Sequence, residues 1–290
     1  MNHPHPSQRT GFRPIELVVV AAILLVLFAL LLPALRKFRE ASNRASCKDH
    51  LRRIGEAIHG YAQANTNNLP PMLGYDPKAG GWGPFWFSLY PHLGEGELYR
   101  RASGCKAGWE ADNYAEVVSV LLCPSDGSHD AGRCTAGAKG WAGTSYAPNY
   151  LVFATGGGYQ PAQKVYTSES RYRLDTIPDG TAQTIAVVER FASFPEYHCS
   201  NAALYPMDRY NWGMNASGSA YGAWGTLPPQ TRALPTGVNA AHPYRPNSAH
   251  SACQVLMMDV SVKPVEASIK RKVWDEACVP NDGTAISSDW

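Results

Sequence analysis

One unbroken run of apolar residues near the N-terminus constrains this chain more than any other feature. Every residue from Leu17 to Leu32 is apolar, and a basic cluster begins shortly afterwards at Arg36. An apolar helix of about 19 residues reaches about 28 Å, roughly the thickness of the hydrocarbon layer of a bilayer. We therefore expect a single transmembrane helix over about residues 15–35.

A carboxylate stands at the edge of this run. Glu16 directly precedes Leu17, where an unpaired charge is costly in lipid and usually marks contact with a partner. If the chain is cut after Gly11, Phe12 gains a free amino group that is cationic near neutral pH. In an assembly of axially staggered helices, Glu16 of one subunit would meet the Phe12 amine of the next, so that neither charge is left unpaired.

These residues carry a family resemblance. The stretch GFRPIELVVVAAILL resembles the leader motif of type IV prepilins, in which Gly is followed by Phe, Thr, Leu, Ile and Glu. The resemblance implies cleavage after Gly11, N-methylation of Phe12, assembly through Glu16 and Phe12, and a helix kink at Pro33. Two alternatives are an uncleaved signal anchor and a secretory signal cut near Ala34, but neither has a use for a carboxylate at position 16.

The helical pattern continues beyond the basic cluster. Between Phe38 and Gln63 apolar residues recur at spacings of mostly three, four and seven, which predicts an amphipathic helix. Asparagines and two prolines between Asn65 and Pro71 predict its end.

This pattern divides the chain into three expected parts. Residues 1–11 form a cleavable leader, residues 12–64 a long N-terminal helix, and residues 65–290 an exported globular part. The resemblance implies a pilin-like fold of the α+β class, in which the helix packs on an antiparallel β-sheet with loop-rich insertions.

The later sequence resembles a more specific family of prepilin-like proteins of unknown function. CKDHLRRIGEAIHG, beginning at Cys47, is similar to the family's Cys-Lys-Asn-Asn-Leu-Lys-Gln-Ile-Gly-Leu-Ala-Leu-His. Members end in a box of His, nine residues and Asp-Gly, whereas here eight residues separate His250 from Asp259, and Val260 replaces the glycine. Since valine disfavours positive φ, we expect a turn other than type I′ or a shifted register. The other family-box residues are Cys123, Asp126, Asn149, Asp179, Gly180 and Glu189.

Short apolar runs separated by turn residues predict the elements of the globular part. The expected elements are short helices around Pro91, strands at Val117–Cys123, Thr144–Phe153 and Thr184–Glu189, a turn at Pro178–Gly180, a hairpin at Cys253–Val265 around Asp259, and a helix within Ala267–Cys278.

Seven cysteines without a CxxC pair argue against the common zinc-site patterns. In an exported domain some of them should pair as disulfides, with the connectivity open and at least one cysteine left over.

Several groups of residues could form chemical sites. Cys123, Asp126 and His129 could hold a metal, but a turn beside a disulfide cysteine is the favoured interpretation. Glu189 could meet His250 or Asp259, yet no nucleophile or acid pair is evident, so we expect no catalytic residues, no enzyme activity and no cofactor. A structural calcium, as some pseudopilins hold, would use the carboxylates of Asp175, Asp179 and Asp259. An aromatic binding surface would use Trp82, Trp86, Trp212 and Trp224, although aromatic residues more often fill a core.

Taken together, these features predict a structural subunit of a type IV pilus or a type II secretion-like pseudopilus. The expected partners are a prepilin peptidase, copies of itself or other pilin-like subunits, and inner-membrane lipid. Its globular part would lie in the periplasm or in an extracytoplasmic filament. A formal net charge of +2 gives no reason to expect nucleic acid. The alternatives are a membrane-tethered module that binds a glycan, protein or solute, and an enzyme that borrowed the leader.

Mass spectrometry of the mature protein from membranes tests the leader. We expect the N-terminus to be N-methylated Phe12, because Gly11-Phe12 stands at the cleavage position of the motif. A chain that begins after Ala34, or one that keeps Met1, would contradict the prediction.

Overall fold

The structure is a computed structural model that describes residues 14–154, 159–160, 165–166, 168–170, 172–204, 226–287 and 290. By its internal contacts the chain divides into an N-terminal unit, residues 1–42, and a head unit, residues 43–290. The described residues form helices and small, mostly antiparallel sheets, which confirms the α+β class.

One helix, α1 (Pro14–Ala64), contributes to both units and contains 51 residues. Proline is tolerated at a first helical position because its missing N–H would have no partner there. The helix ends where the asparagines predict an end: Asn65 Nδ2 donates to Tyr61 O at 2.8 Å, and Thr66 and Asn67 take positive φ values of 54° and 64°.

Within the N-terminal unit, the large apolar side chains of α1 are exposed. Leu17, Val18, Val19 and Val20 are consecutive, and each is at least half exposed. Within the part of the chain that the structure describes, no helix is long and apolar enough to span a membrane. The transmembrane expectation therefore gains no support from the structure.

A four-stranded antiparallel sheet forms the centre of the head unit. Its order is β14-β13-β8-β5, and Leu256 of β13 pairs with both Val187 of β8 and Val262 of β14. Tyr146 of β5 pairs with Glu189 of β8. The strands are β5 (Tyr146–Pro148), β8 (Ile185–Glu189), β13 (Cys253–Met257) and β14 (Val262–Val265).

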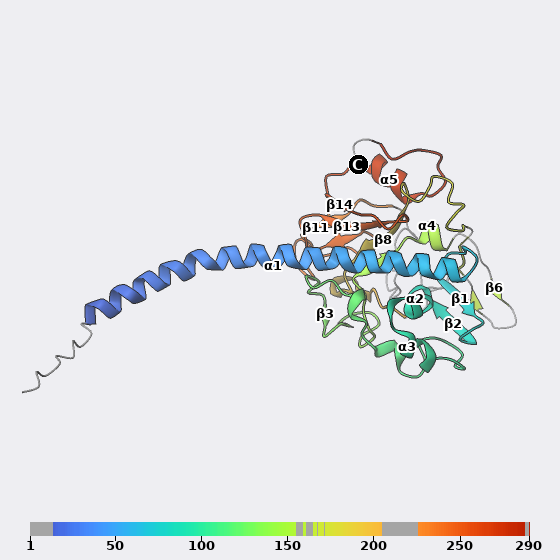
Figure 1. Ribbon diagram of the computed structural model, residues 1–290, viewed down its shortest axis with the longest axis horizontal. Coiled ribbons are helices and arrows are strands. Elements are labelled where there is room, and N and C mark those ends of the chain that lie inside the picture. Colours follow the sequence, from blue (N-terminus) through green and yellow to red (C-terminus); the bar gives the residue numbers. More distant parts are fainter. Residues whose placement is uncertain are drawn as a thin grey trace, which may run out of the picture. The chain divides into compact units, whose positions relative to one another are not determined.

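Both faces of this sheet are covered, so every residue of β8 is buried. Val187 and Leu256 belong to the same core as the buried residues of α1. The alternate residues Val188 and Val255 pack in a second core with α5 (Arg271–Cys278). Because successive side chains in a strand point to opposite faces, the sheet lies between the head-unit part of α1 and α5 (Figure 1).

The helix approaches the sheet closely at Gly55. A Cβ atom at this position would lie 3.0 Å from Leu256 Cδ1 and 3.0 Å from Val260 Cγ1. Glycine therefore lets α1 and the end of β13 pack together without displacing either side chain.

Short elements complete the head unit (Figure 1). They include a short helix that contains Pro91 and another that follows it, which confirms the expectation of short helices around this proline. These elements are β1 (Leu73–Asp76), β2 (Gly81–Pro84), α2 (Phe85–Leu93), α3 (Gly96–Arg101), η1 (Asn113–Ala115), η2 (Ser119–Leu121), β3 (His129–Asp130), β4 (Arg133–Cys134), α4 (Tyr150–Phe153), β6 (Tyr159–Gln160), β7 (Val165–Tyr166), β9 (Ser193–Phe194), η3 (Pro195–Tyr197), β10 (Cys199–Ser200), β11 (Gln230–Thr231) and β12 (Asn247–Ser248).

The strand predicted at Val117–Cys123 is wrong. The segment instead turns through the 3-10 helix η2, where Leu121 N donates to Val118 O at 2.9 Å. Val118, Val120 and Leu121 are buried all the same. A short apolar run signals burial but does not distinguish a strand from a turn of helix, and here the hydrogen bonds are made locally.

The hairpin predicted around Asp259 is confirmed, and its loop differs from a type I′ turn. Val260 N donates to Met257 O at 3.1 Å, and Met257 N donates to Ser261 O at 2.9 Å. The result is a three-residue loop whose last residue, Val260, has a φ of 71°. The turn type does differ as expected, yet the valine itself adopts the left-handed conformation.

Asn149 joins three elements from a fully buried position. Its Oδ1 accepts from Leu151 N at 3.1 Å and so caps α4. Its Nδ2 donates to Ile185 O at 2.9 Å and to Cys278 O at 2.8 Å. The predicted strand at Thr144–Phe153 therefore stops at Pro148, because Asn149 begins a helix instead.

Replacing Asn149 by Ala should destabilise the head unit by about 2–4 kcal/mol, since two buried carbonyl groups lose their donor and α4 loses its cap. Chemical denaturation followed by tryptophan fluorescence measures this, because every tryptophan lies at or beyond Trp82. The control is Asn239→Ala, at an exposed asparagine that also donates to a backbone carbonyl. An Asn149→Ala variant as stable as this control would contradict the prediction.

Candidate functional site

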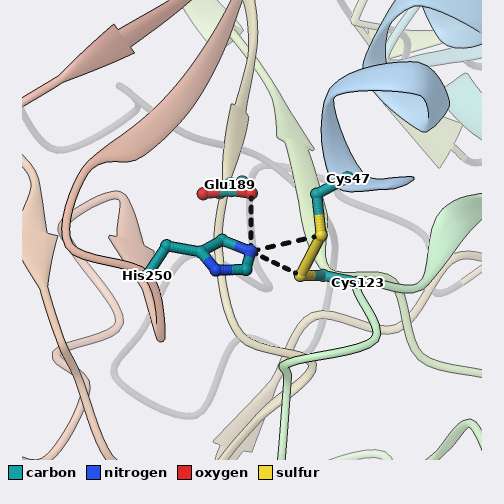
Figure 2. A group of neighbouring side chains, drawn as sticks. All are labelled: Cys47, Cys123, Glu189 and His250. Atoms are coloured by element: carbon teal, nitrogen blue, oxygen red, sulfur yellow. Dashed lines mark hydrogen bonds and ion pairs between the residues drawn. A yellow bond between two sulfur atoms is a disulfide. The ribbon is translucent and has the colours of Figure 1, made fainter. Parts of the chain in front are cut away.

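Four residues from distant parts of the sequence meet in the interior of the head unit. Cys47 lies on α1, Cys123 follows η2, Glu189 ends β8 and His250 precedes β13 (Figure 2). All four are buried, and one potential ligand atom from each lies within 4.8 Å of the others. We call these residues the Cys-His-Glu cluster.

The two cysteines of the cluster form a disulfide. Their Cα atoms are 5.3 Å apart, and the bond closes a separation of 76 residues. The expectation that some cysteines pair is thereby confirmed. The five cysteines outside this disulfide are Cys105, which is half-buried, and the buried Cys134, Cys199, Cys253 and Cys278.

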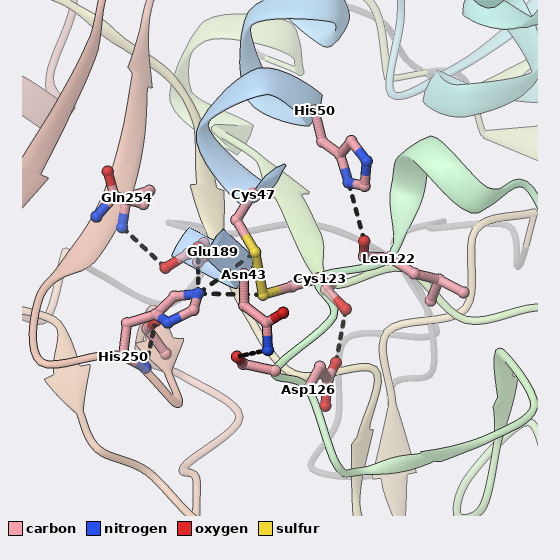
Figure 3. The surroundings of a disulfide bond; sticks show 12 residues. Asn43, Cys47, His50, Leu122, Cys123, Asp126, Glu189, His250 and Gln254 are labelled. Atoms are coloured by element: carbon pink, nitrogen blue, oxygen red, sulfur yellow. Dashed lines mark hydrogen bonds and ion pairs between the residues drawn. A yellow bond between two sulfur atoms is a disulfide. The ribbon is translucent and has the colours of Figure 1, made fainter. Parts of the chain in front are cut away.

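Two hydrogen bonds, one on each side of the disulfide, also join α1 to the residues around Cys123 (Figure 3). One helical turn before Cys47, Asn43 Nδ2 donates to Ser125 Oγ at 3.0 Å. On the other side, His50 Nδ1 is 3.0 Å from Leu122 O, which can only accept, so the imidazole donates. The helix is thus held at three successive positions.

His250 lies against both sulfur atoms. Its Nε2 is 3.3 Å from Cys47 Sγ and 3.3 Å from Cys123 Sγ. A disulfide carries no hydrogen, so a hydrogen bond here requires the proton on Nε2. The same nitrogen is 3.9 Å from Glu189 Oε1.

Glu189 is a buried carboxyl group with two unlike oxygen atoms. Oε2 accepts from Gln254 N at 2.8 Å, whereas Oε1 has no hydrogen-bond partner among the described residues. Burial raises the pKa of the Glu189 carboxyl to about 7, against the opposing effects of His250 and of hydrogen bonds. The free oxygen faces His250 and the sulfurs (Figure 2).

The cluster therefore combines two sulfurs, an imidazole and a carboxyl group in one buried location. Such donors suit a transition metal when the sulfurs are thiolates. In the disulfide form they crosslink the head unit and offer no negatively charged sulfur. Burial of all four residues gives a substrate no direct access to them.

Cys123, Asp126 and His129 do not form the metal site that their spacing allowed. Asp126 N donates to Cys123 O at 2.9 Å, which makes the expected turn. The Asp126 carboxylate accepts from Ser145 Oγ at 2.7 Å and from Ala192 N at 2.9 Å. His129 Nδ1 instead accepts from Gly132 N at 3.1 Å.

The calcium candidates lie in separate local environments. Asp175 bonds to Asn67 and Arg173, Asp179 accepts from the backbone of residues 282 and 283, and Asp259 accepts from Ser261. Apart from the Cys-His-Glu cluster, the described residues contain no group of three metal-ligating side chains. The predicted turn at Pro178–Gly180 is confirmed, with Gly180 at a φ of 90°.

The structure describes only some of the other residues that the sequence analysis named. Gly11 and Phe12 lie outside the described residues, and for Glu16 and Pro33, both within α1, the structure describes no side chain. Of the four tryptophans considered for an aromatic surface, Trp86 is fully buried in the core, which agrees with the favoured interpretation of these residues. Trp212 and Trp224 lie outside the described residues, and Trp82 is half-buried.

Sequence analysis missed the convergence of the cluster. It allowed Glu189 to meet His250, which the structure brings together, but it did not pair Cys47 with Cys123. The available signal was that all four residues lie in boxes that the family resemblance marks.

Removing the disulfide should cost about 2–5 kcal/mol of head-unit stability, because the unfolded chain regains the freedom of a 76-residue loop. The full-length Cys47→Ser/Cys123→Ser double variant should unfold at lower denaturant concentration than the oxidised protein. Cys105→Ser, at a half-buried free cysteine, is the control. Equal midpoints for the double variant and the control would rule out a stabilising crosslink.

Comparison with known proteins gives one assignment. No curated protein matches the sequence and no solved structure matches it. A family model described as "Protein of unknown function (DUF1559)" matches residues 36–272, which is more than half of the chain. The chain therefore belongs to the DUF1559 family.

Proposed function

We propose that this protein is a structural subunit of a type IV pilus or a type II secretion-like pseudopilus, processed by a prepilin peptidase and assembled through its N-terminal helix. In this proposal the head unit lies outside the inner membrane, in the periplasm or on the filament. The protein performs no catalysis, and its partners are copies of itself or related subunits.

The exposed apolar surface of α1 carries the proposal. Large apolar side chains from Ile15 to Phe38 are between 48% and 74% exposed. Because Leu17 to Val20 are consecutive, they point to all sides of the helix. A helix that is apolar all round is stable when other helices or lipid surround it, so this segment requires partners.

The sequence supplies a reason for a fixed order among those partners. Glu16 opens the apolar run, and cleavage after Gly11 would place a cationic amine at Phe12. Pairing of the two charges between subunits would favour one axial offset over the others. Apolar packing then supplies most of the attraction, and the charge pair selects the register.

The head unit suits display outside a membrane. It holds a buried disulfide, and disulfides persist in oxidising compartments such as the periplasm. Its own core is large and includes the head-unit part of α1, with Leu51, Ile54 and Ile58 almost fully buried. The residues of this core all lie within the head unit.

A second candidate is a membrane-tethered module that binds a glycan, protein or solute. Tyr75, Trp82 and Trp109 line a hollow of about 500 Å³, with Lys106 and Glu110 at its side. Tyr75 and Trp82 stand edge to face, with ring centroids 5.7 Å apart. Aromatic faces beside charged groups suit a sugar or a peptide, which favours this alternative over the catalytic one.

Glu16→Ala distinguishes the two candidates. In the native host we expect normal export and cleavage but at least a tenfold loss of the protein from sheared filaments, because the Phe12 amine loses its carboxylate partner. Glu40→Ala, at another glutamate of α1, is the matched control and should assemble.

Immunoblots of the membrane and filament fractions measure the outcome. Wild-type amounts of Glu16→Ala in filaments would contradict assembly through this charge pair. A tethered binding module, in contrast, should capture its ligand equally well with or without the substitution.

A further inference from the structure

The Cys-His-Glu cluster contains potential metal ligands beyond the two sulfurs that form the disulfide. Two sulfurs, the imidazole Nε2 and a carboxylate oxygen all lie within 4.8 Å of one another. We propose that, when the Cys47–Cys123 bond is reduced, the cluster binds one divalent transition-metal ion of the Zn²⁺ type through Cys47, Cys123, His250 and Glu189. The head unit then has two alternative crosslinks at the same place, one covalent and one through a metal.

The identity of the donors argues for this class of metal. Zinc takes four ligands from thiolate sulfur, imidazole nitrogen and carboxylate oxygen, in tetrahedral geometry. Hard cations such as Ca²⁺ and Mg²⁺ instead require mainly oxygen ligands, of which the cluster offers one residue. The set of two sulfurs, one nitrogen and one oxygen therefore selects zinc or a similar borderline ion.

The distances need only a small adjustment. Ligand atoms of tetrahedral zinc lie about 2.0–2.3 Å from the ion, and thus about 3.3–3.8 Å from one another. His250 Nε2 already lies 3.3 Å from each sulfur and 3.9 Å from Glu189 Oε1. Breaking the S–S bond lets the two sulfurs move apart, which opens room for an ion between the four atoms.

Glu189 Oε1 gives independent support. This atom is buried and lacks a hydrogen-bond partner among the described residues, although a buried polar atom normally has one. It faces His250 Nε2, which lies 3.9 Å away (Figure 2). The second oxygen is held by Gln254 N at 2.8 Å, which fixes the carboxyl group in that orientation. A metal ion would satisfy the free oxygen and supply the positive charge that the carboxylate lacks.

The remaining cysteines are poor competitors for the ion. Burial raises the pKa of Cys134 to about 11 and that of Cys199 to about 11, and it raises the pKa of Cys253 well above its usual value. Reduced Cys47 and Cys123 are equally buried, so the difference between the two sets lies in the neighbouring ligands and not in thiol acidity. None of the remaining cysteines belongs to a group of three metal-ligating side chains among the described residues.

Exchange of the disulfide for a metal takes place in two steps. A water-soluble trialkylphosphine gives two electrons to the disulfide, takes its oxygen from water and becomes a phosphine oxide. The two sulfurs receive the electrons and two protons as thiols. Binding of Zn²⁺ or Co²⁺ then releases those two protons and forms two metal–thiolate bonds.

The test uses the full-length protein in a mild detergent, reduced with the phosphine under anaerobic conditions and titrated with Co²⁺ alone. We expect one Co²⁺ per reduced chain, with thiolate-to-cobalt charge-transfer absorption that Zn²⁺ abolishes, and no such absorption from the oxidised chain. A reduced chain that shows no thiolate–cobalt absorption would overturn the proposal.

Substitutions assign the ligands. Cys47→Ser, His250→Gln and Glu189→Gln should each weaken Co²⁺ binding at least tenfold, whereas Cys134→Ser, at a buried cysteine outside the cluster, should leave it unchanged. Loss of binding in Cys134→Ser with retention in Cys47→Ser would place the metal elsewhere.

X-ray absorption of the zinc-loaded wild-type chain needs no variant to fold. It should show two sulfur and two nitrogen or oxygen neighbours. A shell of four sulfurs, or of none, would overturn the assignment.

Discussion

The crosslink between Cys47 and Cys123 is the contact on which the head unit depends. It attaches the first helix to a segment 76 residues later, and the Asn43–Ser125 and His50–Leu122 contacts flank it on either side. A helix held along one stripe presents its buried residues to the sheet in a single register. The close approach at Gly55, where a Cβ atom would lie only 3.0 Å from side-chain carbons of Leu256 and Val260, follows from that register.

Local patterns in the sequence correctly predicted the features that depend only on residues close to one another in the chain. Strand β8, the hairpin around Asp259 and the turn at Gly180 each rest on apolar periodicity or turn residues within a few positions. The helix end at Ala64 was predicted for the same reason, because the asparagines that follow cap it directly. Where local preference and tertiary packing agree, the sequence alone is sufficient to predict the element.

The features that could not be predicted depend on tertiary packing and on contacts between distant parts of the chain. The run before Cys123 is buried as a 3-10 turn because its backbone groups bond locally and to Ser145 N, not to a neighbouring strand. Val260 takes a positive φ, although valine resists it, because the three-residue loop demands it. The Cys-His-Glu cluster unites positions up to 203 residues apart, and no spacing rule relates residues that only the fold brings together.

The continuity of α1 has a mechanical consequence. A single helix begins at Pro14, in the N-terminal unit, and reaches Cys47 without a change of element. Within the head unit, tension along this helix first meets the Asn43–Ser125 hydrogen bond and, one turn later, the covalent Cys47–Cys123 bond. Apolar packing alone yields gradually under a steady pull, whereas an S–S bond does not slide. The disulfide therefore keeps α1 attached to the rest of the head unit under load.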